Sequence, residues 1–144
     1  MTDAFLDPDS SREYLRSWNT RVQQMQERTQ AMSEQIGRLR TTVKDSNDLA
    51  EVTIDSSGVL LDLKLTDRIR RFEPEVVARA VLSALREARV IAAGRAREIA
   101  VETMGPDSLS ARTIGDRLEQ LLEAPDATED DDRDERNDPG WTRR

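Results

Sequence analysis

The sequence has no histidine and no cysteine among its 144 residues. This excludes imidazole base catalysis, thiol nucleophiles, disulfides and the usual zinc ligand sets. Aromatic residues are also scarce, at 3% of the chain: Phe5, Tyr14, Trp18, Phe72 and Trp141. A large aromatic core is therefore excluded, and helices with narrow apolar stripes are favoured. We expect a protein that is not an enzyme and holds neither a metal nor a cofactor.

Long hydrophobic runs are absent as well. No segment approaches the roughly 18 uninterrupted apolar residues of a membrane span. The N-terminal segment MTDAFLDPDSSRE lacks the basic and apolar regions of a signal peptide. We therefore expect a cytoplasmic protein that does not contact a membrane. At 144 residues the chain has room for one domain with a modest core.

The formal net charge of −7 is unevenly distributed. Residues 1–104 carry 17 acidic and 16 basic side chains, residues 105–124 carry 4 and 2, and residues 125–144 carry 8 and 4. Most of the acidity is therefore C-terminal. The overall charge is a poor guide to what the near-neutral remainder of the chain binds.

From Ser10 to about Arg40, apolar residues recur at alternating three- and four-residue spacings, a pattern typical of a coiled coil. With Thr29 filling the one gap, the seam consists of Leu15, Trp18, Val22, Met25, Met32, Ile36 and Leu39. A single amphipathic helix lying on its own domain is the alternative. Because one short domain cannot cover so long a seam, we expect these residues to contact a helix of a second subunit.

Residues 41–65 change to the alternating pattern of strands. The β-branched segment TTVKDSND at 41–48 predicts a short first strand, and residues 49–55 and 59–65 predict two clearer ones. The intervening turn ends in Gly58, which suits a left-handed backbone conformation that closes a bulged hairpin.

The two clearer strands each have one apolar face. Ala50, Val52 and Ile54 share one face, and so do Val59, Leu61, Leu63 and Leu65, opposite Leu60, Asp62 and Lys64. An isolated hairpin is marginally stable in water. We therefore expect the apolar face to pack on the long helices and to extend across a dimer, with Val52, Ile54, Leu61 and Leu63 as candidate contacts.

A second long helix is predicted from Pro74 to about Met104, where Gly105 and Pro106 end it. It contains an alanine ladder at four-residue spacing: Ala84, Ala88, Ala92, Ala96 and Ala100. The ladder reflects either helix propensity alone or close approach of another helix or a sheet. A weaker helical pattern covers residues 107–124, and the composition of residues 125–144 predicts disorder.

The order of long helix, two or three antiparallel strands and long helix resembles the YbaB/EbfC family of bacterial nucleoid-associated proteins. The resemblance covers about residues 22–105 and rests on MQERTQAMSEQIGRL, followed by AEVTIDSSGVLLDLKL and a final VETMG. It implies an α+β fold, a homodimer whose sheets pack together while the helices project as arms, and DNA binding of low sequence specificity in the nucleoid. The N-terminal extension, the added helix and the acidic tail resemble an actinobacterial version of the family.

This organisation divides the chain into four parts. We expect a flexible N-terminus at 1–9, the family-like domain at 10–105, a short C-terminal helix at 106–124 and a disordered acidic tail at 125–144.

Two groups of basic residues are candidates for DNA contact, because neutralising phosphates supplies most non-specific affinity. The first lies between hairpin and helix, and the second lies on the predicted second helix: Lys64, Arg68, Arg70 and Arg71, then Arg86, Arg89, Arg95 and Arg97. Helical periodicity places residues 86, 89 and 97 near one face. Taken singly, each arginine is more often an ordinary solvated charge.

Base-specific recognition is not indicated, since no helix-turn-helix, zinc finger or basic zipper is recognisable and aromatics for base stacking are few. The competing interpretation is a protein-interaction module without DNA binding. In that case the first helix or the 107–124 helix docks a partner protein, as relatives that accompany type VII secretion systems suggest.

Overall fold

The structure, a computed structural model, describes residues 7–123 of the chain. In chain order its elements are α1 (Pro8–Gly37), β1 (Thr41–Lys44), β2 (Ala50–Ile54), β3 (Leu60–Leu65), the 3-10 helix η2 (Asp67–Arg71), α2 (Pro74–Met104) and α3 (Leu109–Glu123). The predicted α+β fold, with two long helices flanking a small antiparallel sheet, is confirmed. Residues 1–6 of the expected flexible N-terminus, and the whole acidic tail, lie outside the described residues.

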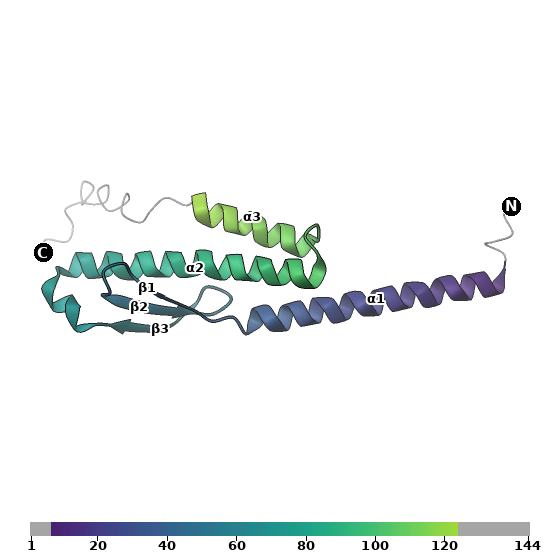
Figure 1. Cartoon of the computed structure of the whole chain (residues 1–144), viewed down its shortest axis with the longest axis horizontal. Helices are drawn as coiled ribbons and strands as arrows, with labels where there is room; N and C mark the ends of the chain where they lie inside the picture. Colours follow the sequence, from purple (N-terminus) through teal and green to yellow (C-terminus); the bar gives the residue numbers. More distant parts are fainter. Residues whose placement is uncertain (1–6, 124–144) are drawn as a thin grey trace, which may run out of the picture.

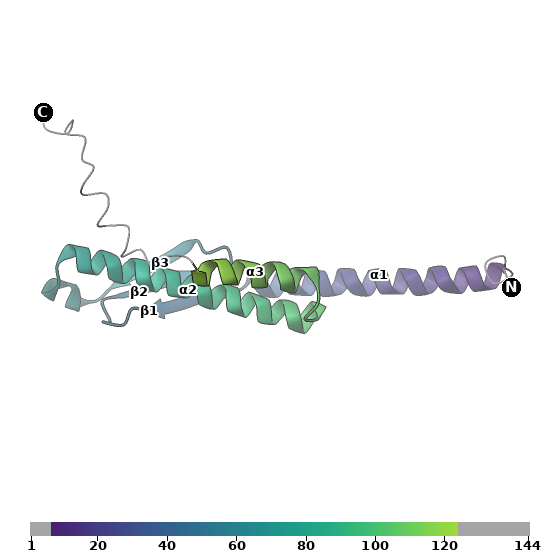
Figure 2. The ribbon, with the colours of Figure 1, turned by 90° about the horizontal axis from the view of Figure 1, so that it is seen from above.

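The elements form an elongated molecule in which α2 lies between the sheet and α3 (Figure 1). Helix α1 continues the sheet layer and projects beyond the end of α2, as Figures 1 and 2 both show. The Thr29 hydroxyl oxygen of α1, which donates to the Met25 carbonyl oxygen at 2.8 Å, lies 3.8 Å from the sulfur of Met104, the last residue of α2. Residues 8–28, about 30 Å of helix at 1.5 Å per residue, therefore extend past α2.

Local residue chemistry sets the start of α1. Pro8 occupies the first helical turn, where its missing N–H is not needed. The carboxylate of Asp7 caps the helix by accepting a hydrogen bond from the backbone N–H of Asp9 at 3.1 Å. These two residues begin α1 two positions earlier than the expected Ser10.

The first two strands are joined by a turn built on Asp45. Its buried carboxylate accepts hydrogen bonds from the backbone N–H groups of Leu49 and Ala50, both at 2.7 Å, and from Asn47 at 3.0 Å. Asp48 takes a positive φ of 55° in this turn. The first strand consequently ends at Lys44, and residues 45–48 form the turn.

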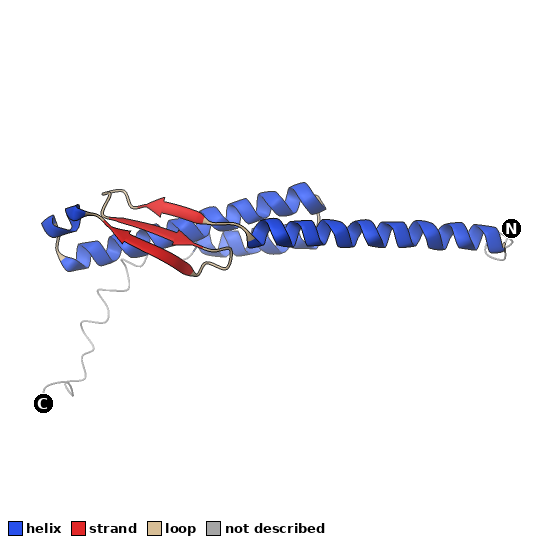
Figure 3. Cartoon of the chain, turned by 90° about the horizontal axis from the view of Figure 1, so that it is seen from below, coloured by secondary structure: helices blue, strands red, loops and turns tan. Residues whose placement is uncertain are grey.

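The β2–β3 turn has the expected conformation. Gly58 adopts φ +83°, and the Asp55 carboxylate accepts from the N–H groups of Ser57 and Val59 at 2.9 and 3.0 Å. The sheet order is β1-β2-β3, all antiparallel, and Figure 3 shows the three strands side by side with α2 behind them. β1 and β3 are therefore the edge strands.

A register shift between Thr53 and Ile54 corrects the face predicted for Leu60. Leu60 pairs with Ile54, and Leu63 pairs with Val52. Because paired residues point to the same face, Leu60 lies on the side of the sheet that faces α2, not on the opposite side. A bulge inserts an extra residue into the strand, so strict alternation from 59 to 65 does not hold.

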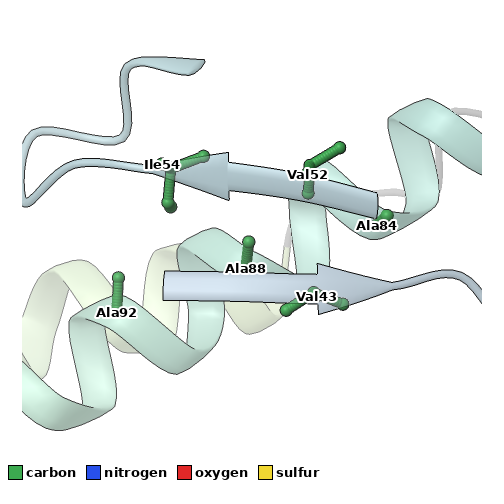
Figure 4. Close-up of a cluster of buried hydrophobic side chains, with 6 residues drawn as sticks. All are labelled: Val43, Val52, Ile54, Ala84, Ala88 and Ala92. Atoms are coloured by element: carbon green, nitrogen blue, oxygen red, sulfur yellow. The ribbon is translucent and has the colours of Figure 1, made fainter. Parts of the chain in front are cut away.

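The main core lies between α2 and the first two strands. Ala84 and Ala88 of α2 pack against Val52 and Ile54 of β2, all four fully buried, together with Val43 of β1 (Figure 4). A methyl side chain is short enough to let the helix backbone lie close to the sheet. The structure therefore favours the second interpretation of the alanine ladder, close approach.

A second cluster fixes the far end of α2. Met32 of α1, Ala100 of α2 and Ala111 of α3 are buried together, with Ile36 and Met104 at their edge. The chain reverses after Met104 because Gly105 adopts φ +94° and Ser108 Oγ accepts from the Ala111 N–H at 3.1 Å. As a result α3 folds back along α2.

Candidate nucleic-acid interface

Three arginines of the first basic group lie on η2, the single 3-10 turn that follows β3. Arg68, Arg70 and Arg71 are all exposed. Within residues 7–123, none of their guanidinium groups makes a hydrogen bond or an ion pair. At three residues per turn, Arg68 and Arg71 lie on one side of the turn. Asp67 is the only acidic residue of η2, so the segment Asp67–Arg71, which we call the η2 cluster, carries a net charge of +2.

Lys64 belongs to a different surface. It sits on β3 opposite Glu51 of β2, and Lys44 of β1 forms an ion pair with the same glutamate at 3.9 Å. The exposed face of the sheet is therefore a mixed one, with carboxylates beside its lysines. Lys64 is close to η2 in sequence, but Glu51 on the neighbouring strand reduces the positive potential around Lys64.

The arginines of α2 do not form one patch. Arg89 Nε donates to the carbonyl oxygen of Gly58 in the β2–β3 turn at 3.4 Å. Arg97 instead lies against α3, where a Cβ added at Gly115 would be 3.4 Å from Arg97 Nε. Arg86 is half-buried, while Arg95 is exposed. The predicted common face of Arg86, Arg89 and Arg97 is thus divided between two neighbouring elements.

The η2 cluster and the α2 arginines are also separated along the molecule. η2 precedes the first residue of α2, at the end of the molecule away from α1 (Figure 1). The helix rises 1.5 Å per residue, which puts Arg97 about 35 Å from Pro74. One chain therefore presents the η2 cluster and several separate arginines rather than one continuous basic surface.

The seam of α1 is covered only at its C-terminal end. Leu15, Trp18 and Met25 are 56%, 53% and 58% exposed. Met32 is buried against α2 and α3, and Ile36 packs at its edge. Val22 and Leu39 are half-buried. The first part of the predicted seam thus has no apolar cover within the described chain.

Of the four candidate dimer contacts on the sheet, two are buried and two are exposed. Val52 and Ile54 are fully buried by α2 of the same chain, so they form the intrachain core instead of a surface that a second subunit could reach. Leu61 and Leu63 remain 50% and 40% exposed. The reason is that α2 crosses β1 and β2 and leaves edge strand β3 uncovered.

No group of three or more Asp or Glu side chains in residues 7–123 is arranged to hold a metal ion. None of the helices in that range is long and apolar enough to cross a membrane.

A model of the YbaB/EbfC DNA-binding family matches residues 15–106. This range includes the projecting part of α1 from Leu15 onward, the whole sheet, η2 and α2, and it ends before α3. No curated protein matched the chain.

Proposed function

The chain belongs to the YbaB/EbfC DNA-binding family, and from this premise we propose that it is a homodimeric nucleoid-associated protein of the cytoplasm. It binds duplex DNA through the phosphate backbone and with low sequence specificity. It performs no reaction on the DNA.

The observation that carries this proposal is the η2 cluster. Arg68, Arg70 and Arg71 are exposed, close in sequence and without a partner in residues 7–123. Their guanidinium donors are therefore available to phosphate oxygens. Each phosphate contact releases condensed counterions, and this release favours binding on any sequence.

Low specificity follows from the same geometry. A 3-10 turn of five residues presents arginines at the tip of the molecule, but it is too short to lie along the major groove as a recognition helix does. Contacts from such a turn reach the sugar-phosphate backbone, which positions a protein without identifying bases.

Dimerisation is supported by the uncovered edge strand. The five apolar residues Val59, Leu60, Leu61, Leu63 and Leu65 are 40–56% exposed. An exposed apolar edge strand is a site of pairing or aggregation unless something covers it. A second copy that covers β3 would bury these side chains and place two η2 clusters on one particle, which doubles the number of phosphate contacts.

The test is the salt dependence of DNA binding by the full chain. Replacing Arg68, Arg70 and Arg71 by Gln should weaken binding equally on unrelated duplexes. It should also reduce the slope of log Kobs against log salt by about five, close to one unit for each of the roughly six phosphate contacts that the proposed dimer loses. Fluorescence anisotropy at several salt concentrations measures both quantities.

A matched control removes the same charge from a distant surface. Arg12, Arg16 and Arg28 are exposed on α1, and their replacement by Gln should leave the slope near the wild-type value. If both triple variants lose the same affinity, total charge governs binding and the η2 cluster has no special part in it. If the wild-type chain forms no complex at low salt, the proposed function is wrong.

A protein-interaction module is the second candidate, and the exposed seam of α1 favours it. Leu15, Trp18 and Met25 are more than half exposed, and an apolar stripe on a projecting helix is a typical docking surface for another helix. Pull-down from lysate after nuclease treatment separates the two: partners lost with the nucleic acid support DNA binding, whereas partners retained support the protein module.

A further inference from the structure

We propose that Arg89 of α2 and Arg117 of α3 form a pocket that binds a phosphate group. The phosphate belongs either to the DNA backbone, in which case the inference rests on the proposed function, or to a free phosphorylated molecule. Arg117 follows the last residue of the family match, residue 106. The site is therefore one that the α3 extension adds to the family domain.

The pocket is a cavity of about 130 Å³ between the β2–β3 turn, α2 and α3. Ser56 and Gly58 of the turn line it together with the two arginines, and Ala93 and Ala96 of α2 belong to its apolar wall. Small side chains on α2 leave space between the two helices. No carboxylate is among the residues that line this cavity in the described part of the chain, so its charged groups are both cationic.

The turn holds Arg89 at the cavity. Its Nε donates to the Gly58 carbonyl oxygen at 3.4 Å, which leaves the two terminal nitrogens of the guanidinium for another acceptor. A Cβ at Gly58 would come within 3.4 Å of the same Nε, and φ is +83° there. Glycine at this position thus satisfies the backbone conformation of the turn and leaves room for the guanidinium group.

Helical spacing places Arg117 beside the apolar residues of α3 that line the cavity. Ile114 lies three residues before it and Leu121 four residues after it, so all three occupy one side of the helix. Within residues 7–123, the Arg117 guanidinium makes no hydrogen bond or ion pair. Its donors are therefore free to bind an anion.

Two guanidinium groups without a carboxylate favour a doubly charged oxyanion. Arginine offers a planar pair of N–H donors that matches two phosphate oxygens, and the bonds are charge-assisted. The cavity has the volume of about four water molecules at ~30 Å³ each, which is enough for the five heavy atoms of a phosphate group. The apolar wall lowers the local dielectric constant and strengthens the attraction.

The test uses the amide resonances of Ser56 and Gly58 in the full chain as reporters of the cavity. Inorganic phosphate is titrated against chloride at equal ionic strength. Saturable shifts are expected in the wild type and in R112Q, a matched control on the same helix whose arginine does not line this cavity. In R117Q the apparent Kd should rise about tenfold or the shifts should disappear, because a charge-assisted contact is lost.

Two further arms identify the source of the phosphate. If the source is DNA, R117Q should reduce the salt slope of duplex binding by about two, one unit for each chain of the proposed dimer, while R112Q should not. If the source is a free molecule, the slope is unchanged and pyrophosphate saturates the Gly58 shift at a lower concentration than phosphate does.

The outcomes separate this inference from the proposed function. A chain that binds no DNA but whose Gly58 responds to phosphate through Arg117 supports the pocket and contradicts the proposed function. Two results would contradict the phosphate pocket. In the first, R117Q and R112Q show the same phosphate response and the same salt slope of DNA binding. In the second, the Gly58 resonance of the wild type does not respond to phosphate and R117Q leaves the salt slope of DNA binding unchanged.

Discussion

At the scale of single residues, two aspartates determine the geometry of the sheet. Asp45 accepts three backbone hydrogen bonds in the β1–β2 turn, and Asp55 accepts two in the β2–β3 turn. Side chains of this type mimic the backbone and stabilise turns. Asp45 has the greater effect because it is buried, and its loss would leave buried N–H groups unpaired.

Replacement of Asp45 by Ala should lower the free energy of unfolding by about 3 kcal/mol. The estimate follows from the cost of roughly 1–3 kcal/mol for leaving a buried polar group unsatisfied, applied to the Leu49 and Ala50 N–H groups. Urea denaturation followed by circular dichroism measures the change. Asp62→Ala removes the same charge from an exposed position of β3 and should cost less than about 0.5 kcal/mol. Equal losses in the two variants would contradict the role given to the turn.

At the scale of elements, the decisive feature is which apolar faces are covered. The alanines of α2 bring it close to β1 and β2, whereas β3 and the first part of α1 keep their apolar side chains exposed. The exposed residues fall on the strand and on the seam that the sequence patterns singled out. This is the arrangement expected if part of the hydrophobic burial occurs between chains.

Introducing a charge on β3 should therefore disrupt the proposed dimer. Leu61→Lys and Leu63→Lys place an ammonium group where the partner's apolar surface would lie, and burying an unpaired charge costs several kcal/mol. Sedimentation velocity should show a monomer over a concentration range in which the wild type is a dimer, while far-ultraviolet circular dichroism is unchanged.

Ser83→Lys on α2 is the matched control, because this exposed serine lies on another element and the added charge is the same. The control should sediment as the wild type does. A wild-type chain that is monomeric at every concentration would remove the basis for a dimer through β3.

At the scale of the whole molecule, charge is distributed unevenly between two regions. The η2 cluster is net positive, whereas residues 125–144, which lie outside the described residues, carry eight acidic and four basic side chains. A segment of net charge −4 on the same chain lowers the potential that DNA meets as it approaches. Its effect should depend on ionic strength.

Removal of residues 125–144 should strengthen DNA binding severalfold at 50 mM salt, and the difference should shrink as salt is raised. Screening is the reason, because the Debye length falls from about 10 Å at 0.1 M to about 3 Å at 1 M. Anisotropy titrations at three salt concentrations measure the effect. A full-length variant with four of the eight carboxylates of the tail changed to amides, which brings the net charge of the tail to zero, should behave in the same way. A gain that persists at high salt would indicate that the tail acts by something other than its charge.

Much of the fold could be predicted from local patterns. The heptad spacing indicated α1, alternation indicated β2 and β3, and Gly58 indicated the bulged turn, because each signal depends on residues a few positions apart. The face of Leu60 was predicted wrongly, since a bulge shifts the register without altering composition. The candidate arginines could be named from sequence, but the cavity that joins Arg89 to Arg117 could not.

By itself, the sequence determined the order and type of the long helices and strands, the Gly58 turn, the end of α2 at Gly105, and the resemblance that the family match then confirmed. Only the tertiary structure decided how their surfaces are used. It buries Val52 and Ile54 under the α2 alanines, leaves Leu61 and Leu63 exposed, and leaves the η2 cluster unpaired within the described chain. The physical reason is the separation in sequence of the residues involved. Turns and periodicity depend on residues a few positions apart, whereas burial depends on which distant element packs on a surface and excludes water from it.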